Sequence, residues 1–142
     1  MHDINVITGA IIDSAMRIHT ALGPGLFESV YEVLLERDLS RSGFLVQRQV
    51  PVGFEYDGIR FEHAFVLDLL VDRAVVVEIK SVERLNHVYE KQLQTHLRLA
   101  DCRVGLLLNF NEARLKDGLK RIVNRLPEPA LRRPLSAASP SP

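Results

Sequence analysis

The sequence has no tryptophan, one cysteine, no excess of charge of either sign and no long apolar run. The single cysteine, Cys102, cannot close a disulfide within the chain, which is typical of a reducing compartment, and its apolar surroundings favour a buried side chain. Eighteen Lys and Arg balance eighteen Asp and Glu, so contact with nucleic acid must come from a local patch. The longest apolar stretches, residues 64–71 and 104–108, are far shorter than the roughly 20 residues of a membrane helix. We therefore expect a cytoplasmic protein with no membrane contact.

Hydrophobic spacing divides the chain into helices and strands. A period near 3.6 predicts three helices, over residues 4–22, 26–42 and 87–100. Asp3 and Asn86 are the expected N-caps of the first and third helices. The apolar stripe of the second helix is expected to consist of Val30, Leu34, Leu35 and Leu39. A period of two predicts five strands, over residues 45–56, 59–71, 74–80, 103–109 and 119–123. Tight turns at residues 57–58 and 72–73 join the first three of them.

The order of these elements predicts an α/β fold in which helices flank a mixed β-sheet. The first three strands follow one another through short turns and should pair antiparallel, whereas the helix before the fourth strand allows parallel pairing. Five of the seven prolines lie in residues 127–142, which we expect to be a disordered tail after one domain at residues 1–126.

Two carboxylates stand in apolar strands. Glu78 and Lys80 lie on the same face of the third strand, about 7 Å apart, because each residue rises ~3.3 Å. Asp68 interrupts the second strand, and the intervening turn brings it close to Glu78. Two buried carboxylates repel each other, so one must hold a proton or a cation must lie between them. Oxygen ligands without clustered Cys or His favour Mg²⁺ or Mn²⁺.

A simpler interpretation stays open at this point. Glu78 and Lys80 can form an ion pair at a sheet edge, with Asp68 paired to Arg60 or Arg73. Such pairs are common on sheets and carry no function.

The spacing of Asp68 and Glu78-Ile79-Lys80 resembles the core motif of the PD-(D/E)XK nuclease superfamily. Residues 25–31 match the signature of the GxxExxY proteins, a branch of that superfamily, and further agreement extends over about residues 4–126. The resemblance implies a restriction-endonuclease-like core. It implies Asp68 and Glu78 as metal ligands, with the Ile79 carbonyl as a third, and Lys80 as the catalytic lysine. Glu28 would be an acidic residue near the metal, although at a helix start it can also serve the helix dipole alone.

The resemblance also implies roles for residues on the helices. Gln92 would lie beside the active site, and His96 stands where related proteins have a tyrosine, as a candidate for substrate contact. Tyr31 is a candidate for substrate contact or for packing. Leu67 stands where a proline is common. Taken alone, Gln92 reads as a solvated residue and His96 as a surface or core residue.

Residues 112–133 carry a local excess of positive charge, with Lys116, Lys120 and Arg121 as candidate phosphate contacts. A solvated face explains the same charges equally well. Aromatic residues are few and form no evident base-stacking array, so we do not expect sequence-specific readout.

The set of residues favours a Mg²⁺-dependent nuclease that acts on DNA or RNA, with Glu28, Asp68, Glu78, Lys80 and Gln92 in the active site. The alternative from another class is a binding or scaffold protein that retains the nuclease fold, and a third is a metal hydrolase of small molecules. A scaffold has no need of the complete acid and lysine set, which this chain has. A homodimer is left open.

Overall fold

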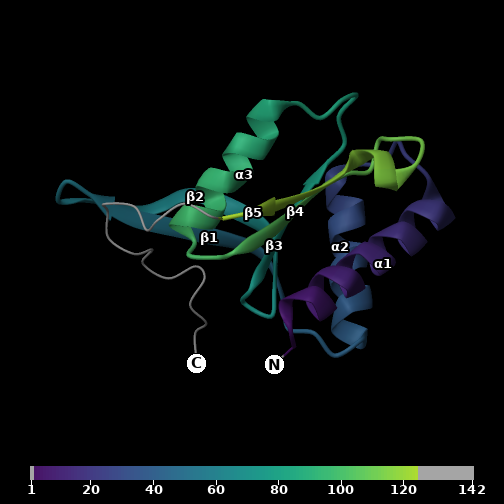
Figure 1. The fold of residues 1–142 in the computed structure, drawn as a ribbon, viewed down its shortest axis with the longest axis horizontal. Helices are drawn as coiled ribbons and strands as arrows, with labels where there is room; N and C mark the ends of the chain where they lie inside the picture. Colours follow the sequence, from purple (N-terminus) through teal and green to yellow (C-terminus); the bar gives the residue numbers. More distant parts are fainter. Residues whose placement is uncertain (1, 125–142) are drawn as a thin grey trace.

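The computed structural model describes residues 2–124. Five strands form one sheet in the order β1-β2-β3-β4-β5, in which only β3 and β4 are parallel (Figure 1). The helices are α1 (Ile4–Leu22), α2 (Glu28–Arg41), α3 (His87–Leu99) and the 3₁₀ turn η1 (Leu115–Gly118). The strands are β1 (Val46–Tyr56), β2 (Ile59–Val71), β3 (Val75–Lys80), β4 (Val104–Asn109) and β5 (Leu119–Val123). The expected α/β fold with a mixed sheet flanked by helices is confirmed, and it agrees with a restriction-endonuclease-like core.

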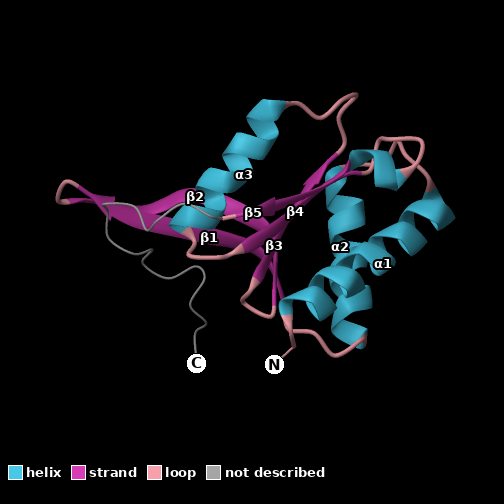
Figure 2. Ribbon diagram, viewed as in Figure 1, coloured by secondary structure: helices cyan, strands magenta, loops and turns pink. Residues whose placement is uncertain are grey.

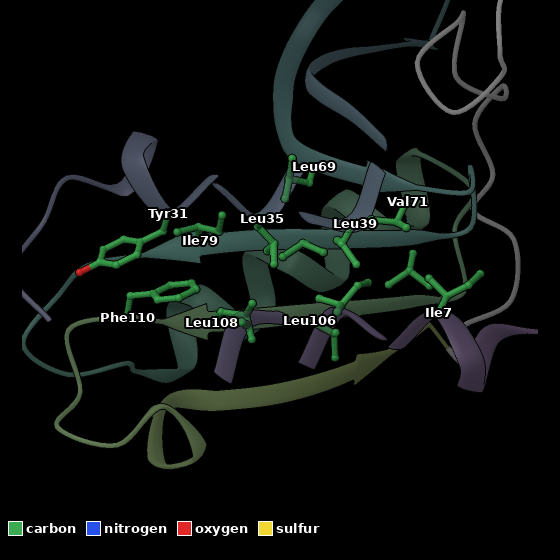
Figure 3. Packing of buried hydrophobic residues seen from close by; sticks show 14 of the residues in the cluster. Ile7, Tyr31, Leu35, Leu39, Leu69, Val71, Ile79, Leu106, Leu108 and Phe110 are labelled. Atoms are coloured by element: carbon green, nitrogen blue, oxygen red, sulfur yellow. The ribbon is translucent and has the colours of Figure 1, made fainter. Parts of the chain in front are cut away.

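Helices cover the sheet on both faces (Figure 2), because each strand of the centre is apolar on both sides. α1 and α2 pack on one face through Ile7, Leu35 and Leu39, against strand residues that include Leu69 and Leu106 (Figure 3). α3 packs on the other face through a second cluster that includes Leu93, Leu97 and Val76. β3 and β4 are buried between these two layers, so polar side chains on them are held in place by their surroundings.

The expected N-caps and the expected apolar face of α2 are confirmed only in part. Asn86 Oδ1 accepts a hydrogen bond from Val88 N at 2.9 Å, as predicted for an N-cap. Asp3 occupies the N-cap position of α1, but its side chain makes no cap hydrogen bond. The expected apolar stripe of α2 is wrong in part, because Val30 is exposed and Tyr31, with Leu35 and Leu39, faces the core.

The β1–β2 ribbon extends beyond the part of the sheet that the helices cover (Figure 1). Its tip is the expected two-residue turn, in which Asp57 and Gly58 both have positive φ. A register shift lies at Gly53, where a Cβ atom would stand 2.3 Å from the carbonyl oxygen of Phe61. Glycine is therefore required at this irregularity. Exposed apolar side chains of the ribbon include Tyr56, Ile59 and Phe61.

Cys102 is buried, as expected. None of the helices within residues 2–124 combines the length and the apolar character that crossing a bilayer needs. The expected disordered tail at residues 127–142 lies outside the described residues.

Candidate active site

The sheet opens between β2 and β3 at the position of the two acidic residues. β2 and β3 pair regularly only as far as Leu69 opposite Val77, and Asp68 would come next, opposite Glu78. At this position the backbone N–H groups bond to carboxylate side chains of the neighbouring strand. Ile79 N donates to Asp68 Oδ2 at 2.8 Å, and Asp68 N donates to Glu78 Oε2 at 3.3 Å. The expected meeting of the two carboxylates on neighbouring strands is therefore observed.

Glu78 is the more deeply buried of the two acids, with 6% of its surface exposed. Burial first, and the charge of Asp68 second, raise the pKa of its carboxyl from 4.5 to about 8. The Asp68 N–H and the Lys80 ammonium oppose the rise without cancelling it. In the protein alone, Glu78 therefore holds a proton at neutral pH.

The pKa of Asp68 is also raised, first by burial and then by the negative charges of Glu32 and Glu28. The hydrogen bond from Ile79 N and the charge of Lys80 lower it in part. Several acids thus converge on one opening of the sheet, where the charges of Glu28 and Glu32 make ionisation of Asp68 less favourable.

Lys80 lies on the same side of β3 as Glu78 and Val76, the side that α3 covers. Its Nζ stands 5.0 Å from the ring centroid of Tyr89 on α3, a cation–π arrangement. No ion pair joins Lys80 to an acid anywhere in the described part of the chain. The ammonium group therefore remains available beside the two carboxylates.

The simpler interpretation, in which ion pairs neutralise these residues, is wrong. β3 is the central strand of the sheet and not an edge. Arg60 pairs with Glu62 at 4.0 Å, and among residues 2–124 neither Asp68 nor Glu78 has a basic partner within salt-bridge distance.

Glu28 ties the start of α2 to the end of β3. Its Oε2 accepts a hydrogen bond from Ser81 N at 2.9 Å, and Ser81 Oγ donates to Leu26 O at 3.2 Å. Glu28 itself is exposed, and its charge raises the pKa of both Asp68 and Glu78. It therefore lies close to the acid pair while remaining open to solvent.

Tyr31 fixes the loop that precedes α2. Its hydroxyl donates to Gly23 O at 2.7 Å and accepts from Leu26 N at 3.2 Å, while its ring stacks on Phe110 with centroids 4.3 Å apart (Figure 3). Because the ring is completely buried, Tyr31 orients the loop and has no surface for a substrate. This placement corrects the expectation of a substrate contact and supports the alternative of packing.

Glu32 is a buried acid that sequence reasoning missed. It lies one helical turn after Glu28, and its carboxylate accepts hydrogen bonds from Arg48 and from Gln49 Nε2, the latter at 2.8 Å. Gln49 has a positive φ of 53°, a conformation that is uncommon for this residue type and that marks many functional sites. The spacing of four residues from Glu28 was the available signal.

The two candidate residues of α3 differ in exposure. His96 is buried, and its ring stacks on Phe65 with centroids 4.1 Å apart. Burial, aided by the charge of Lys80, lowers the pKa of His96 to about 4, so the imidazole is neutral near pH 7. Its Nδ1 is buried and has no hydrogen-bond partner among the described residues. Gln92 is exposed one turn earlier on the helix.

Within residues 112–124, the part of the expected basic patch that the structure describes, the basic side chains do not form one surface. Lys120 lies opposite Leu107 of the α3-side cluster, whereas Arg121 lies opposite Leu106 of the other cluster. Arg121 instead donates to Thr8 Oγ1 at 3.4 Å, on α1. Lys116 is exposed on η1. Because successive side chains of a strand point to opposite faces, the neighbours Lys120 and Arg121 lie on opposite faces of the sheet.

The donor atoms at the opening fit a hard divalent cation. They are carboxylate oxygens, which Mg²⁺ and Mn²⁺ prefer, and the raised pKa values of Asp68 and Glu78 reflect first their burial and then the negative charges around them. Within the described ranges no three Asp, Glu, His or Cys side chains form a ready-made metal cluster. A cation here would therefore rely on two carboxylates, with backbone oxygens or water completing its shell.

Comparison with known families gives one match: the PD-(D/E)XK nuclease superfamily matches residues 5–122. No curated protein and no solved structure matches the chain.

Proposed function

Because the chain belongs to the PD-(D/E)XK nuclease superfamily, we propose that it hydrolyses phosphodiester bonds of DNA or RNA with the help of Mg²⁺ or Mn²⁺. Asp68 and Glu78 are the proposed metal ligands, with the Ile79 carbonyl as a third, and Lys80 is the proposed catalytic lysine. Agreement of residues 25–31 with G-x-x-E-x-x-Y supports assignment to that branch of the superfamily.

The observation that carries this proposal is the pair of carboxylates at the sheet opening. Both have raised pKa values, and neither has a basic partner among residues 2–124. Such an arrangement destabilises a protein unless a ligand compensates for it. A divalent cation would do so, and when bound it would polarise a phosphate and stabilise the charge that develops in hydrolysis.

The remaining residues have roles that follow from their positions. Lys80 places a positive charge beside the acids, where it can orient a water molecule and offset the negative charge of a phosphate. Glu28 holds Ser81 and thereby fixes the end of β3. Glu32, held by Arg48 and Gln49, keeps α2 in register with β1.

A cleavage panel tests the proposal. Single- and double-stranded DNA and RNA are incubated with Mg²⁺ or Mn²⁺ and the wild-type protein, Asp68→Asn, Lys80→Ala or Lys91→Ala. We expect cleavage by the wild type and by Lys91→Ala, an exposed lysine on α3, and loss of at least 100-fold in the other two, on the order of the factor for a group that stabilises the transition state. Circular dichroism checks folding.

Calorimetric titration with Mn²⁺ distinguishes the proposed nuclease from a scaffold protein that retains the nuclease fold. The proposal requires a site that is present in the wild type and lost in Asp68→Asn. The nuclease proposal is wrong if the wild type has no such Mn²⁺ site and if the wild type and Lys80→Ala give identical products in the cleavage panel.

A further inference from the structure

An open pocket of about 550 Å³ adjoins the candidate active site. It lies among the loop before α2, the first turn of α2 and the segments that follow β3 and β4, and its lining includes Phe27, Glu28, Ser29, Ser81 and Asn111. Its volume lies within the roughly 300–1,000 Å³ of small-ligand sites. Glu28, whose charge raises the pKa of Asp68 and of Glu78, forms part of its wall, so a ligand here would lie against a residue of the candidate active site.

Phe27 is the most exposed large apolar side chain of the described residues, with 82% of its surface accessible. The exposure is not due to a loose loop, because Tyr31 and Ser81 both hydrogen-bond to the adjacent Leu26. A phenyl ring held in water on an ordered loop gains free energy when a flat apolar surface covers it.

The same pocket offers uncommitted polar groups. The Asn111 amide and the Ser29 hydroxyl are exposed, and neither side chain makes a hydrogen bond within residues 2–124. An amide presents both donors and an acceptor, as the edge of a nucleobase does. Ring and amide together match a ligand with an aromatic face and a polar edge.

We propose that this pocket binds an unpaired nucleobase next to the scissile phosphate, with the base stacked on Phe27 and its edge bonded to Asn111 and Ser29. The inference rests on the proposed nuclease function. In a duplex each base face is covered by its neighbours, so the ring can stack only on a base that is unpaired. The substrate is therefore single-stranded nucleic acid or a single-stranded segment, and recognition tolerates any base because every base has an aromatic face.

The chain has no tryptophan, which makes a direct test available. Phe27→Trp and the matched control Tyr56→Trp, at an exposed aromatic on the β1–β2 ribbon, are each titrated with single-stranded oligonucleotide in the Asp68→Asn background. We expect the oligonucleotide to quench the fluorescence of Phe27→Trp and leave Tyr56→Trp unchanged, while a duplex of the same sequence quenches neither. Equal behaviour of the two variants overturns the proposal.

A double-mutant cycle measures the contact itself. Phe27→Ala should weaken single-strand binding by about 5- to 150-fold, the range for loss of one base–aromatic stack. The loss should vanish when an abasic nucleotide replaces the base beside the cleavage position. Tyr56→Ala should bind like the parent protein.

Failure of the two proposals is distinguishable. If the wild type cleaves nothing but Phe27→Ala still loses single-strand binding, the nuclease proposal fails and the base site stands. If the wild type cleaves and Phe27→Ala binds single strands as tightly as the parent, the base site is refuted and the nuclease proposal stands.

Discussion

Replacing Glu78 by glutamine should stabilise the metal-free protein while removing one of the two proposed metal ligands. A carboxyl whose pKa is 4.5 in the unfolded chain and about 8 in the folded protein lowers the free energy of unfolding by about 3 kcal/mol at pH 7, since one pKa unit corresponds to about 1.4 kcal/mol. The folded protein binds more protons than the unfolded chain between pH 4.5 and 8, so wild-type stability should fall as pH rises through this window. Glu78→Gln has no titrating group at this position, so its free energy of unfolding should not show this decrease.

The amide keeps the local hydrogen bond, because its oxygen can accept from Asp68 N as the carboxylate does. The gain of Glu78→Gln over the wild type should therefore be near zero at pH 4 and about 3 kcal/mol at pH 7. Urea unfolding followed by circular dichroism in EDTA, at several pH values, measures this difference.

Addition of Mn²⁺ should reverse the order of stability. The wild type gains free energy from binding the cation, whereas Glu78→Gln lacks one of the two proposed ligands. A variant that is less stable than the wild type at pH 7 in EDTA, or a difference that does not depend on pH, would refute the reasoning about the acid pair.

Three other substitutions or treatments test separate features. Tyr31→Phe keeps the stack on Phe110 but loses the hydroxyl that holds the loop; urea unfolding should show a loss of about 1 kcal/mol, and an unchanged midpoint would contradict that role. Gly53→Ala places a Cβ atom against a backbone carbonyl and should cost about 1–3 kcal/mol, which thermal unfolding measures against Gly9→Ala, where a Cβ meets open space. Cys102, whose pKa burial raises to about 11, should resist iodoacetamide at pH 8 in the native protein and react in urea, as mass spectrometry would report; rapid native labelling would show that the thiol is accessible.

The sheet could be predicted from the sequence because its signals are local. A two-residue turn at residues 57–58 and a three-residue turn at residues 72–74, where the sequence predicted two residues, both contain residues with positive φ and set the antiparallel register. The crossover helix after β3 set the parallel pair. The position of Asp68 beside Glu78 followed from the turn between their strands. These features depend on spacing along the chain and little on distant contacts.

The features that the sequence did not predict depend on which face each helix or strand turns toward its neighbours. The inward face of α2 includes Tyr31 and Glu32, and polarity alone placed neither of them there. Glu32 is buried only because Arg48 and Gln49 arrive from β1, 16 and 17 residues later in the chain. The basic residues of β5 looked like one patch in sequence, yet strand alternation sends Lys120 and Arg121 to opposite faces.

Among residues 2–124, β1 is an outer strand of the sheet and pairs with β2 alone. A free strand of this length invites other chains to add to it and grow into fibres. Pro51 removes one backbone donor from this strand, and the irregularity at Gly53 interrupts its repeat. Both features make the outer edge of β1 a poorer template for strand addition, an effect that is separate from any chemistry at the acid pair.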